Sequence, residues 1–401
     1  MTIDLIDIDF AFYPKLPTMK IQKWHYFAGQ WKNHFTDNEF DQEQAQLVLA
    51  FGESSLCTNP ELFNTLKDRF PKAHIVTSST AGEIISDEVC DNSMVVTAIQ
   101  LEKTSIRCSF ANVQQQANSF ETGQHLMSEL LTNDLSSVFV ISDGTHINGS
   151  DLVAGLNESN KVPGRNIPIT GGLAADGSRF NKTFVGLNQI PTTGAVVAIG
   201  FYGNSIRIGH GSFGGWDEFG TERVITRSDK NILYEIDDKN ALDLYKEYLG
   251  PYKNELPGSA LLFPLSIKEP NCDEHVVRTI LNIDEQKKSM LFAGNLPTGS
   301  TVRFMKANFD RLIDGSSIAA QKAFTALSEI QPELVILISC VGRKLILQDR
   351  TDEEVEAVRK IFGGNPPITG FYSYGEISPF NPRTRCELHN QTMTITTFCE
   401  V

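Results

Sequence analysis

Three polar loops and one strand end carry the residue types best suited to binding a small molecule. Each follows a short apolar run, and together they hold Ser79, Thr80, Glu83, Asp176, Arg343, Tyr372, Tyr374 and Glu376. Carboxylates suit an amino group, tyrosines suit a planar or apolar body, and an arginine suits a carboxylate. Loops at the carboxyl ends of strands commonly bind ligands, because backbone N–H groups there are free. The alternative interpretation is that the acids cap nearby backbone and the glycines serve turn geometry.

Histidine is the second candidate for chemistry. No pair among the eight histidines has the H-x-x-x-H or H-E-x-x-H spacing, so the pattern does not favour a zinc hydrolase. One histidine is enough to ligate haem iron. The candidates are His146 and His210, in glycine-rich stretches, and His389, immediately before the last predicted strand. For each of them the alternative is an ordinary structural or surface role.

A hydrolase or transferase would need a nucleophile, and the candidates are Ser142 and Cys340. Ser142 and Asp143 lie close to His146, but neighbours on a strand point to opposite faces, so contiguity does not assemble a triad. The G-x-S-x-G motif is absent. Cys340 ends an apolar run, where a buried structural cysteine is the alternative. We therefore expect no catalytic residue, and an enzyme with a strand-end nucleophile stays the competing hypothesis.

A β-α-β-loop-β unit that recurs three times must position these residues. The copies begin near Gln46, Val138 and Leu334. When the first copy is shifted by 100 residues onto the second, five residues are identical, including Ser105 and Ser205. The first two strands of each copy are apolar throughout, as in buried parallel strands. Later strands alternate, as in antiparallel pairing. The pattern predicts an α/β to α+β fold, with mixed sheets flanked by helices.

The length of 401 residues favours two domains. We predict an N-terminal extension over residues 1–40, a first domain with two copies over 41–230, and a second domain with one copy plus an insertion over 231–401. In the third copy, residues 351–362 are expected to form an amphipathic helix whose first turn is closed by a capping box of Thr351 and Glu354.

Composition excludes several classes of partner. The net charge of −14 disfavours nucleic acid and anionic membranes. No apolar run reaches the roughly 18 residues of a membrane span, so no membrane insertion is expected. Asp4, Asp7 and Asp9 leave no apolar signal segment at the N-terminus. Seven scattered cysteines suit a reducing compartment. We therefore expect a cytoplasmic protein.

The chain resembles the FIST family in five strings distributed over most of its length. They are Ser79-Thr-Ala-Gly-Glu-Ile, Gly171-Gly-Leu-Ala-Ala-Asp-Gly, Gly214-Gly-Trp, Cys340-Val-Gly-Arg and Gly370-Phe-Tyr-Ser-Tyr-Gly-Glu-Ile-Ser-Pro. The resemblance implies a FIST N-terminal domain followed by a FIST C domain. It also implies a sensory module that binds a small ligand, with amino acids proposed as ligands for the family. The expected partner is a signalling protein such as a histidine kinase or a cyclic-nucleotide enzyme.

A stand-alone bacterial subset of the family, the NosP-type proteins, is similar in layout, binds haem and senses nitric oxide. That likeness makes haem the candidate cofactor, and its ligand would come from the three histidines named above. For the ligand pocket we predict an interdomain cleft lined by Arg343, Tyr372, Tyr374 and Glu376. Ser79, Thr80 and Glu83 would contribute from the N-terminal domain. This interdomain placement rests on analogy with other two-domain proteins, in which such clefts often hold the ligand.

Overall fold

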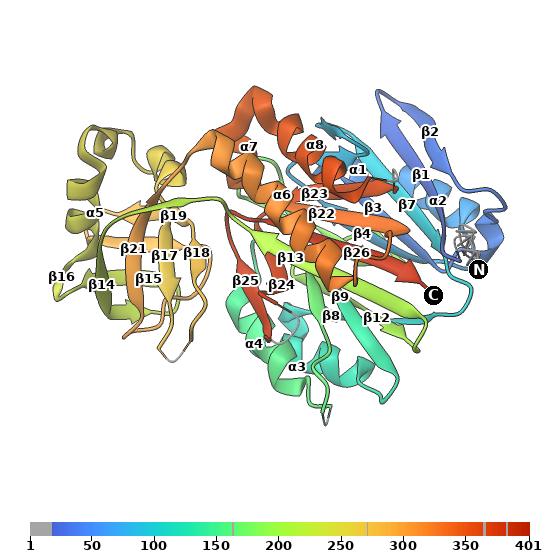
Figure 1. Ribbon diagram of the computed structural model, residues 1–401, viewed down its shortest axis with the longest axis horizontal. Helices are drawn as coiled ribbons and strands as arrows, with labels where there is room; N and C mark the ends of the chain where they lie inside the picture. The colour runs from blue at the N-terminus through green and yellow to red at the C-terminus, as the bar shows by residue number, and fades with distance from the viewer. Residues whose placement is uncertain (1–17, 163, 271, 364–365, 382–383) are drawn as a thin grey trace, which may run out of the picture.

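A computed structural model describes residues 18–162, 164–270, 272–363, 366–381 and 384–401. Three six-stranded sheets with their helices form what we call the body, from the described parts of residues 18–216 and 307–401. A fourth, eight-stranded sheet with one helix forms the lobe, from residues 217–306, and it lies beside the body at the left of Figure 1. Mixed sheets flanked by helices confirm the predicted fold class.

Each of the three repeated units builds the same four-stranded arrangement. Its first two strands are parallel, the closing strand is antiparallel to the first, and the strand preceding the unit lies outside the closing strand. In the first sheet these are β3 (Leu47–Gly52), β4 (His74–Ser79), β7 (Met94–Gln100) and β1 (Lys20–Phe27), with β2 (Gln30–Thr36) beyond them. In the second they are β9 (Leu135–Ser142), β10 (Ile169–Leu173), β12 (Ala195–Tyr202) and β8 (Ser105–Asn112). In the third they are β22 (Leu334–Cys340), β23 (Ile368–Ser373), β26 (Met393–Glu400) and β13 (Ile206–Phe213).

The segment after the second strand of each unit joins the sheet of a different unit. The hairpin of β5 (Glu83–Ile85) and β6 (Glu88–Cys90) pairs with β23. The hairpin of β24 (Gly375–Pro379) and β25 (Cys386–His389) pairs with β10. Strand β11 (Val185–Leu187) pairs with β4. The first unit thus adds strands to the sheet of the third, the third to that of the second, and the second to that of the first. This exchange is a closed cycle, so no unit completes its own sheet.

One apolar core lies between the three sheets, and helices cover their outer faces. In β3, Leu49 and Phe51 join this central core with Phe139, Ile336 and Phe371 from the other two sheets. The alternate residues of β3 instead pack under a helix layer. Both faces are therefore dry, which is why these strands are apolar throughout. The covering helices are α1 (Ser54–Cys57), α2 (Pro60–Arg69), α3 (Ser119–Leu130), α4 (Gly149–Ser159), α6 (Phe309–Ala326), α7 (Val341–Leu347) and α8 (Thr351–Phe362).

Asparagine begins most of the longer helices. The side chains of Asn59, Asn118, Asn148 and Asn308 each accept the N–H group two or three residues into their helix, which satisfies a donor that has no helical partner. Helix α8 has the predicted bounds, but the predicted capping box is wrong. Thr351 bonds back to the carbonyl of Gln348, and α8 has no side-chain cap at its start.

The lobe has its own core and two connections to the body. The chain leaves the body after β13, through 214–216, and returns after β21, through 307–308. The lobe comprises β14 (Asp217–Asp229), β15 (Ile232–Ile236), β16 (Lys239–Asn240), α5 (Ala241–Leu249), β17 (Leu265–Lys268), β18 (Val276–Arg278), β19 (Ile280–Asp284), β20 (Ser289–Phe292) and β21 (Thr301–Lys306). Its core includes Leu233, Tyr245 and Phe304.

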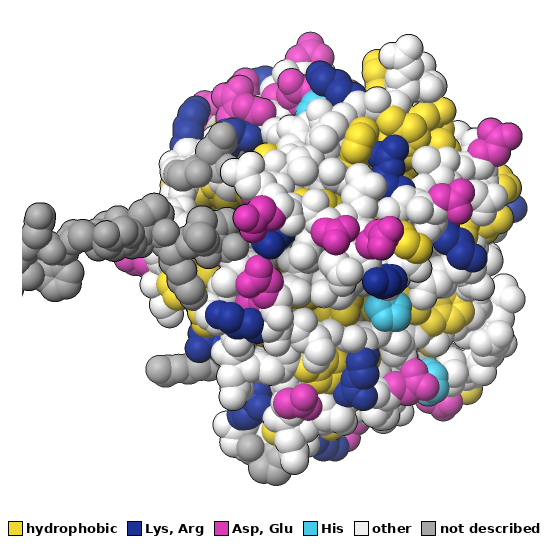
Figure 2. Space-filling view, turned by 90° about the vertical axis from the view of Figure 1, so that its right-hand side faces the viewer, with side chains coloured by type: hydrophobic (Ala, Val, Ile, Leu, Met, Phe, Trp, Pro, Cys, Tyr) yellow, Lys and Arg dark blue, Asp and Glu magenta, His cyan; other side chains and the backbone are white. Residues whose placement is uncertain are grey.

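Figure 2 shows the end of the body that lies away from the lobe. Charges of one sign do not dominate this face. Acidic and basic side chains are interspersed there. Among the helices of the described residues, none is long and apolar enough to cross a bilayer.

A buried arginine holds both connections between body and lobe. Arg343 in α7 is fully buried, and its guanidinium donates to Glu354 Oε2 at 3.0 and 2.8 Å. It also donates to the carbonyl of Gly214, at 2.6 Å, in the first connection. A further bond, at 2.7 Å, reaches the carbonyl of Leu312 in the first turn after the second connection. Glu354 also accepts the hydroxyl of Tyr372.

We expect Arg343→Met to lower the free energy of unfolding by about 3–5 kcal/mol, because it leaves Glu354 as a buried charge without its partner. Arg343→Met combined with Glu354→Leu should cost less than the sum of the two single changes. Urea unfolding of the four proteins measures this. Arg350→Met removes a half-buried arginine that pairs with Glu353 and Asp310, and serves as the control. If Arg343→Met costs no more than this control, the buried pair does not stabilise the fold.

Candidate functional site

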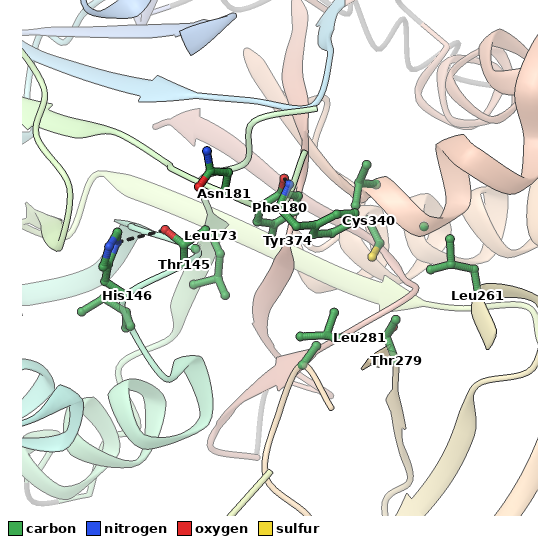
Figure 3. A pocket seen from close by; sticks show the side chains of 15 residues that line it. Thr145, His146, Leu173, Phe180, Asn181, Leu261, Thr279, Leu281, Cys340 and Tyr374 are labelled. Atoms are coloured by element: carbon green, nitrogen blue, oxygen red, sulfur yellow. Dashed lines mark hydrogen bonds between the residues drawn. The ribbon is translucent and has the colours of Figure 1, made fainter. Parts of the chain in front are cut away.

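A cavity of about 290 Å³ lies between the body and the lobe. The body contributes the segments that follow β9, β10, β22 and β23, and the lobe contributes Leu261, Thr279, Leu281 and Ala293. Figure 3 shows side chains of the body along the upper edge of the cavity and those of the lobe below. Four strand ends meet here because the hairpin exchange brings the end of β23 next to that of β10.

An aromatic pair forms part of the body wall. The rings of Phe180 and Tyr374 are stacked, with centroids 4.6 Å apart and planes 15° apart. The hydroxyl of Tyr374 bonds Asp176 Oδ1 and accepts the N–H of Phe180 at 3.0 Å. Phe180 has φ of +50° and is 45% exposed. A bulky residue rarely adopts this backbone conformation, so the loop stores strain to keep the ring at the cavity.

At one end of the cavity Thr145 and a buried carboxylate hold His146. Thr145 Oγ1 lies 3.0 Å from His146 Nδ1, and Figure 3 draws this bond. Asp143 is fully buried and accepts the backbone N–H groups of Thr145, His146 and Gly194 at 2.6–2.8 Å. Its Oδ2 lies 3.2 Å from His146 Nδ1. The ring is therefore held through Nδ1, and within the described residues no hydrogen bond engages Nε2.

Of the two candidate nucleophiles, Cys340 lines the cavity and Ser142 does not. Burial raises the pKa of Cys340 far above its usual range, so its cavity-lining side chain is a neutral thiol. The Ser142 hydroxyl is fully buried and donates to the backbone carbonyl of Asp143 at 3.0 Å. A serine nucleophile needs a base that accepts its proton, and this hydroxyl instead bonds a carbonyl.

Of the eight residues expected to bind ligand, Tyr374 alone lines this cavity, and Asp176 supports it from behind. Arg343 and Tyr372 are fully buried around Glu354. Ser79 accepts the N–H of Phe184 and so helps to position the loop between β10 and β11.

The two expected glutamates occupy matching buried positions in the first and third units. Thr80 and Ser93 donate to the two oxygens of Glu83. Ser373 and Thr392 donate to the two oxygens of Glu376 in the same way. In both units the first donor lies three residues before the acid, and the second directly precedes the closing strand. The carboxylates therefore link each loop to its own closing strand.

Sequence patterns missed most of the cavity wall. Phe180, Asn181 and Thr145 lie in loops without a motif, and Thr279 and Leu281 come from the lobe, outside the repeated units. Other wall residues do lie in the quoted motifs, among them Leu173, Val341 and Gly342. For the missed loops the available signal was Phe180, a large aromatic residue inside an otherwise polar stretch.

The three histidines considered for haem differ in accessibility. Burial lowers the pKa of both His210 and His389 to about 4. His389 Nε2 donates to the carbonyl of Ser378 at 2.9 Å, which occupies that nitrogen. His210 is 5% exposed, with Nδ1 unpaired. His146 lines the cavity described above, whereas His389 lines a second cavity between body and lobe, of about 280 Å³. A carboxylate on Nδ1 is the usual support for a metal-ligating histidine.

The size of the cavity limits what can occupy it. Pockets for drug-sized molecules range from roughly 300 to 1,000 Å³, and about 290 Å³ lies at the lower end of this range. His146 could supply a ligand to haem iron, but the volume of the cavity suits a molecule much smaller than a porphyrin. Haem fits only if the lobe lies further from the body than it does here.

Comparisons with known proteins place the chain in a family. Residues 46–239 match the FIST N domain and residues 241–379 match the FIST C domain. The chain belongs to the FIST family, as its motifs indicated, and FIST domains are associated with sensory signal transduction. The uncharacterized protein MJ1623 of Methanocaldococcus jannaschii is 23% identical over 340 residues, which are 75% of this chain and 61% of that protein. The chain thus spans less than two thirds of that relative.

Two solved structures show weak likeness over most of the chain. The cyanuric acid hydrolase of A. caulinodans aligns with a TM-score of 0.35 and 8% identity, covering 90% of this chain and 91% of that one. A second cyanuric acid hydrolase structure gives a TM-score of 0.35 and 9% identity, covering 96% and 100%. Likenesses of this strength carry no argument about activity.

The buried glutamates predict a pH-dependent stability. Burial raises the pKa of Glu83 to about 7 and that of Glu376 to about 8, whereas a glutamate in the unfolded chain titrates near 4.3, so between about pH 4 and pH 8 the folded state binds more protons. The stabilisation is therefore complete at low pH and is lost as the pH rises through the folded-state values. The side chain of Glu376→Gln cannot titrate. In this variant the free energy of unfolding should therefore fall less steeply with pH, most clearly between about pH 7 and pH 8.

Urea unfolding at about pH 5, 7 and 9 would measure the effect. Glu356→Gln, on the exposed side of α8, is the control and should keep the slope of the parent protein. An equal slope in Glu376→Gln would mean that Glu376 has an ordinary pKa.

Proposed function

We propose that this protein is a non-enzymatic sensor that binds a small ligand between the body and the lobe and passes its state to a signalling partner. The observation that carries the proposal is the position of the cavity, because residues of both parts line it. A ligand that contacts both walls favours one orientation of the lobe, and a partner can recognise that orientation. Membership of the FIST family supports a sensory role.

A route from the cavity to the connections supports the same proposal. Val341 and Gly342, at the start of α7, line the cavity. The next residue, Arg343, bonds the carbonyl of Gly214 in one connection and that of Leu312 just beyond the other. A ligand that displaces the start of α7 therefore acts one residue away from the side chain that fixes both connections.

The neutral Cys340 thiol and the engaged Ser142 hydroxyl support a binding function over catalysis. The seven cysteines are scattered along the sequence, a pattern that suits a reducing compartment such as the cytoplasm. A histidine kinase or a cyclic-nucleotide enzyme is the proposed partner class, by analogy with the family.

A second candidate function is haem-based sensing of nitric oxide, with His146 as the iron ligand. The Asp143 carboxylate on His146 Nδ1 is the observation that favours it. Bound haem would supply an iron centre for the gas, and Asp143 would keep Nε2 directed to the metal. This candidate requires a wider cleft, so it predicts that haem binding moves the lobe.

Occlusion of the cavity tests the main proposal. Leu281 lines it and is 43% exposed, whereas Leu291 on the next strand is 37% exposed and does not line it. We expect Leu281→Trp to fold normally and to lose the rise in melting temperature that a metabolite collection produces in the parent protein. Leu291→Trp should respond as the parent does. Equal responses of both variants would place the ligand elsewhere, and turnover of ester or amide substrates by the parent would favour the enzyme.

Absorption spectra test the second candidate. Protein mixed with haemin should show a Soret band that His146→Ala shifts or abolishes, while His125→Ala, on the exposed face of α3, leaves it unchanged. An identical band in both variants would exclude His146 as the ligand.

A further inference from the structure

Among the described residues, the wall of the cavity between body and lobe includes no lysine, arginine, aspartate or glutamate. Most of it is aliphatic or aromatic, including Leu173, Phe180, Leu281 and Val341. Its histidine, His146, already has the Asp143 carboxylate beside it. A charged group that enters such a wall loses its hydration and finds no opposite charge.

Two arginines that adjoin wall residues in sequence are engaged elsewhere. Arg278, next to Thr279, is 1% exposed, and it donates to the carbonyls of Leu388 and Asn295 at 2.8 and 3.1 Å. Arg343, next to Gly342, is held by Glu354. Neither guanidinium belongs to the wall, so a ligand carboxylate in the cavity meets neither of them.

The wall nevertheless offers unused uncharged polar groups. Thr279 is 5% exposed and lines the cavity, and its hydroxyl has no hydrogen-bond partner in the described part of the chain. A buried hydroxyl without a partner is costly and calls for an explanation. Asn181, on the opposite wall, is exposed, and within the described residues its carboxamide makes no hydrogen bond. Both groups suit a neutral donor or acceptor on a ligand.

The stacked rings of Phe180 and Tyr374 supply the third element. In Figure 3 this pair lies across the cavity from Thr279 and Leu281. A planar apolar body beside the rings gains aromatic contact, while a polar substituent on its other edge can reach toward the Thr279 hydroxyl.

We propose that the cavity selects a neutral, planar aromatic ligand with one uncharged hydrogen-bonding substituent, which bonds Thr279 Oγ1. The proposal rests on the sensor function proposed above and narrows its ligand class. It departs from the zwitterionic amino acids expected from the family resemblance, because neither an ammonium nor a carboxylate group has a counter-charge in this wall.

Three probes of similar size that differ in charge test the proposal, namely benzamide, benzoate and benzylammonium. Saturation-transfer NMR on the full chain reports their binding to the cavity. We expect benzamide to bind at least about tenfold more tightly than either ion, because the ions must shed their hydration. Leu281→Trp should abolish binding of benzamide and Leu291→Trp should not.

Thr279→Val tests the assigned hydrogen bond. The change is close to isosteric and removes a hydroxyl that has no partner in the protein, so the fold should be retained. We expect weaker binding of benzamide by several-fold and unchanged binding of toluene, which lacks the amide. If Thr279 contributes only packing, the substitution should change the affinities for benzamide and toluene by the same factor.

The outcomes separate this proposal from the sensor function. If an ion binds as tightly as benzamide, or if none of the probes binds while metabolites still stabilise the parent protein, the neutral ligand class is overturned and the sensor proposal stands. If benzamide binds Leu281→Trp as well as the parent, the cavity is not the binding site and both proposals fail. If Thr279→Val loses equal affinity for benzamide and for toluene, the assigned hydrogen bond is overturned.

Discussion

The arrangement of body and lobe depends on one buried ion pair, Arg343 with Glu354. Two charges without solvent contact are costly unless every donor and acceptor is used. Here the guanidinium bonds Glu354 and the backbone at Gly214 and Leu312, while Glu354 also accepts the Tyr372 hydroxyl. The same atoms thus join two helices, a strand of the third sheet and the chain at both connections to the lobe. A core made only of apolar contacts would tolerate small rotations of the lobe more readily, since such contacts have no direction.

The repeated units and their strands could be predicted because both follow from local patterns. Strands such as β3 are apolar at every position since one face meets the central core and the other meets a helix layer. The helix over 351–362 was likewise predicted from its apolar spacing. Its capping box was not correct, because Glu354 turns inward to Arg343, 11 residues away in sequence. A local rule that treats Glu354 as a cap has no information about such a partner.

The exchange of hairpins explains why the site was predicted only in part. Sequence shows that a loop follows each second strand, but not which sheet accepts the segment after it. Glu83 and Glu376 look like ligand-binding acids in sequence, yet each is enclosed by two hydroxyl side chains of its own unit. Tyr374 reaches the cavity because its hairpin pairs with β10, in a different unit. The lobe residues of the wall have no counterpart in the repeat, so no periodicity could have indicated them.

The cavity lies where the repeat departs from its own symmetry. In the first and third units a short turn separates the second strand from the following hairpin, and a glutamate closes it. The second unit instead has a longer segment, residues 174–184, between β10 and β11. That segment carries Asp176, which bonds Tyr374 of the third unit, and Phe180, which is held in a strained conformation against the same ring. The second unit thus departs from a turn that the first and third units share. Such departures are expected at functional positions, since stability alone would favour the same turn in all three units. The broken symmetry therefore points to the same wall as the unpaired Thr279 hydroxyl, from an independent observation.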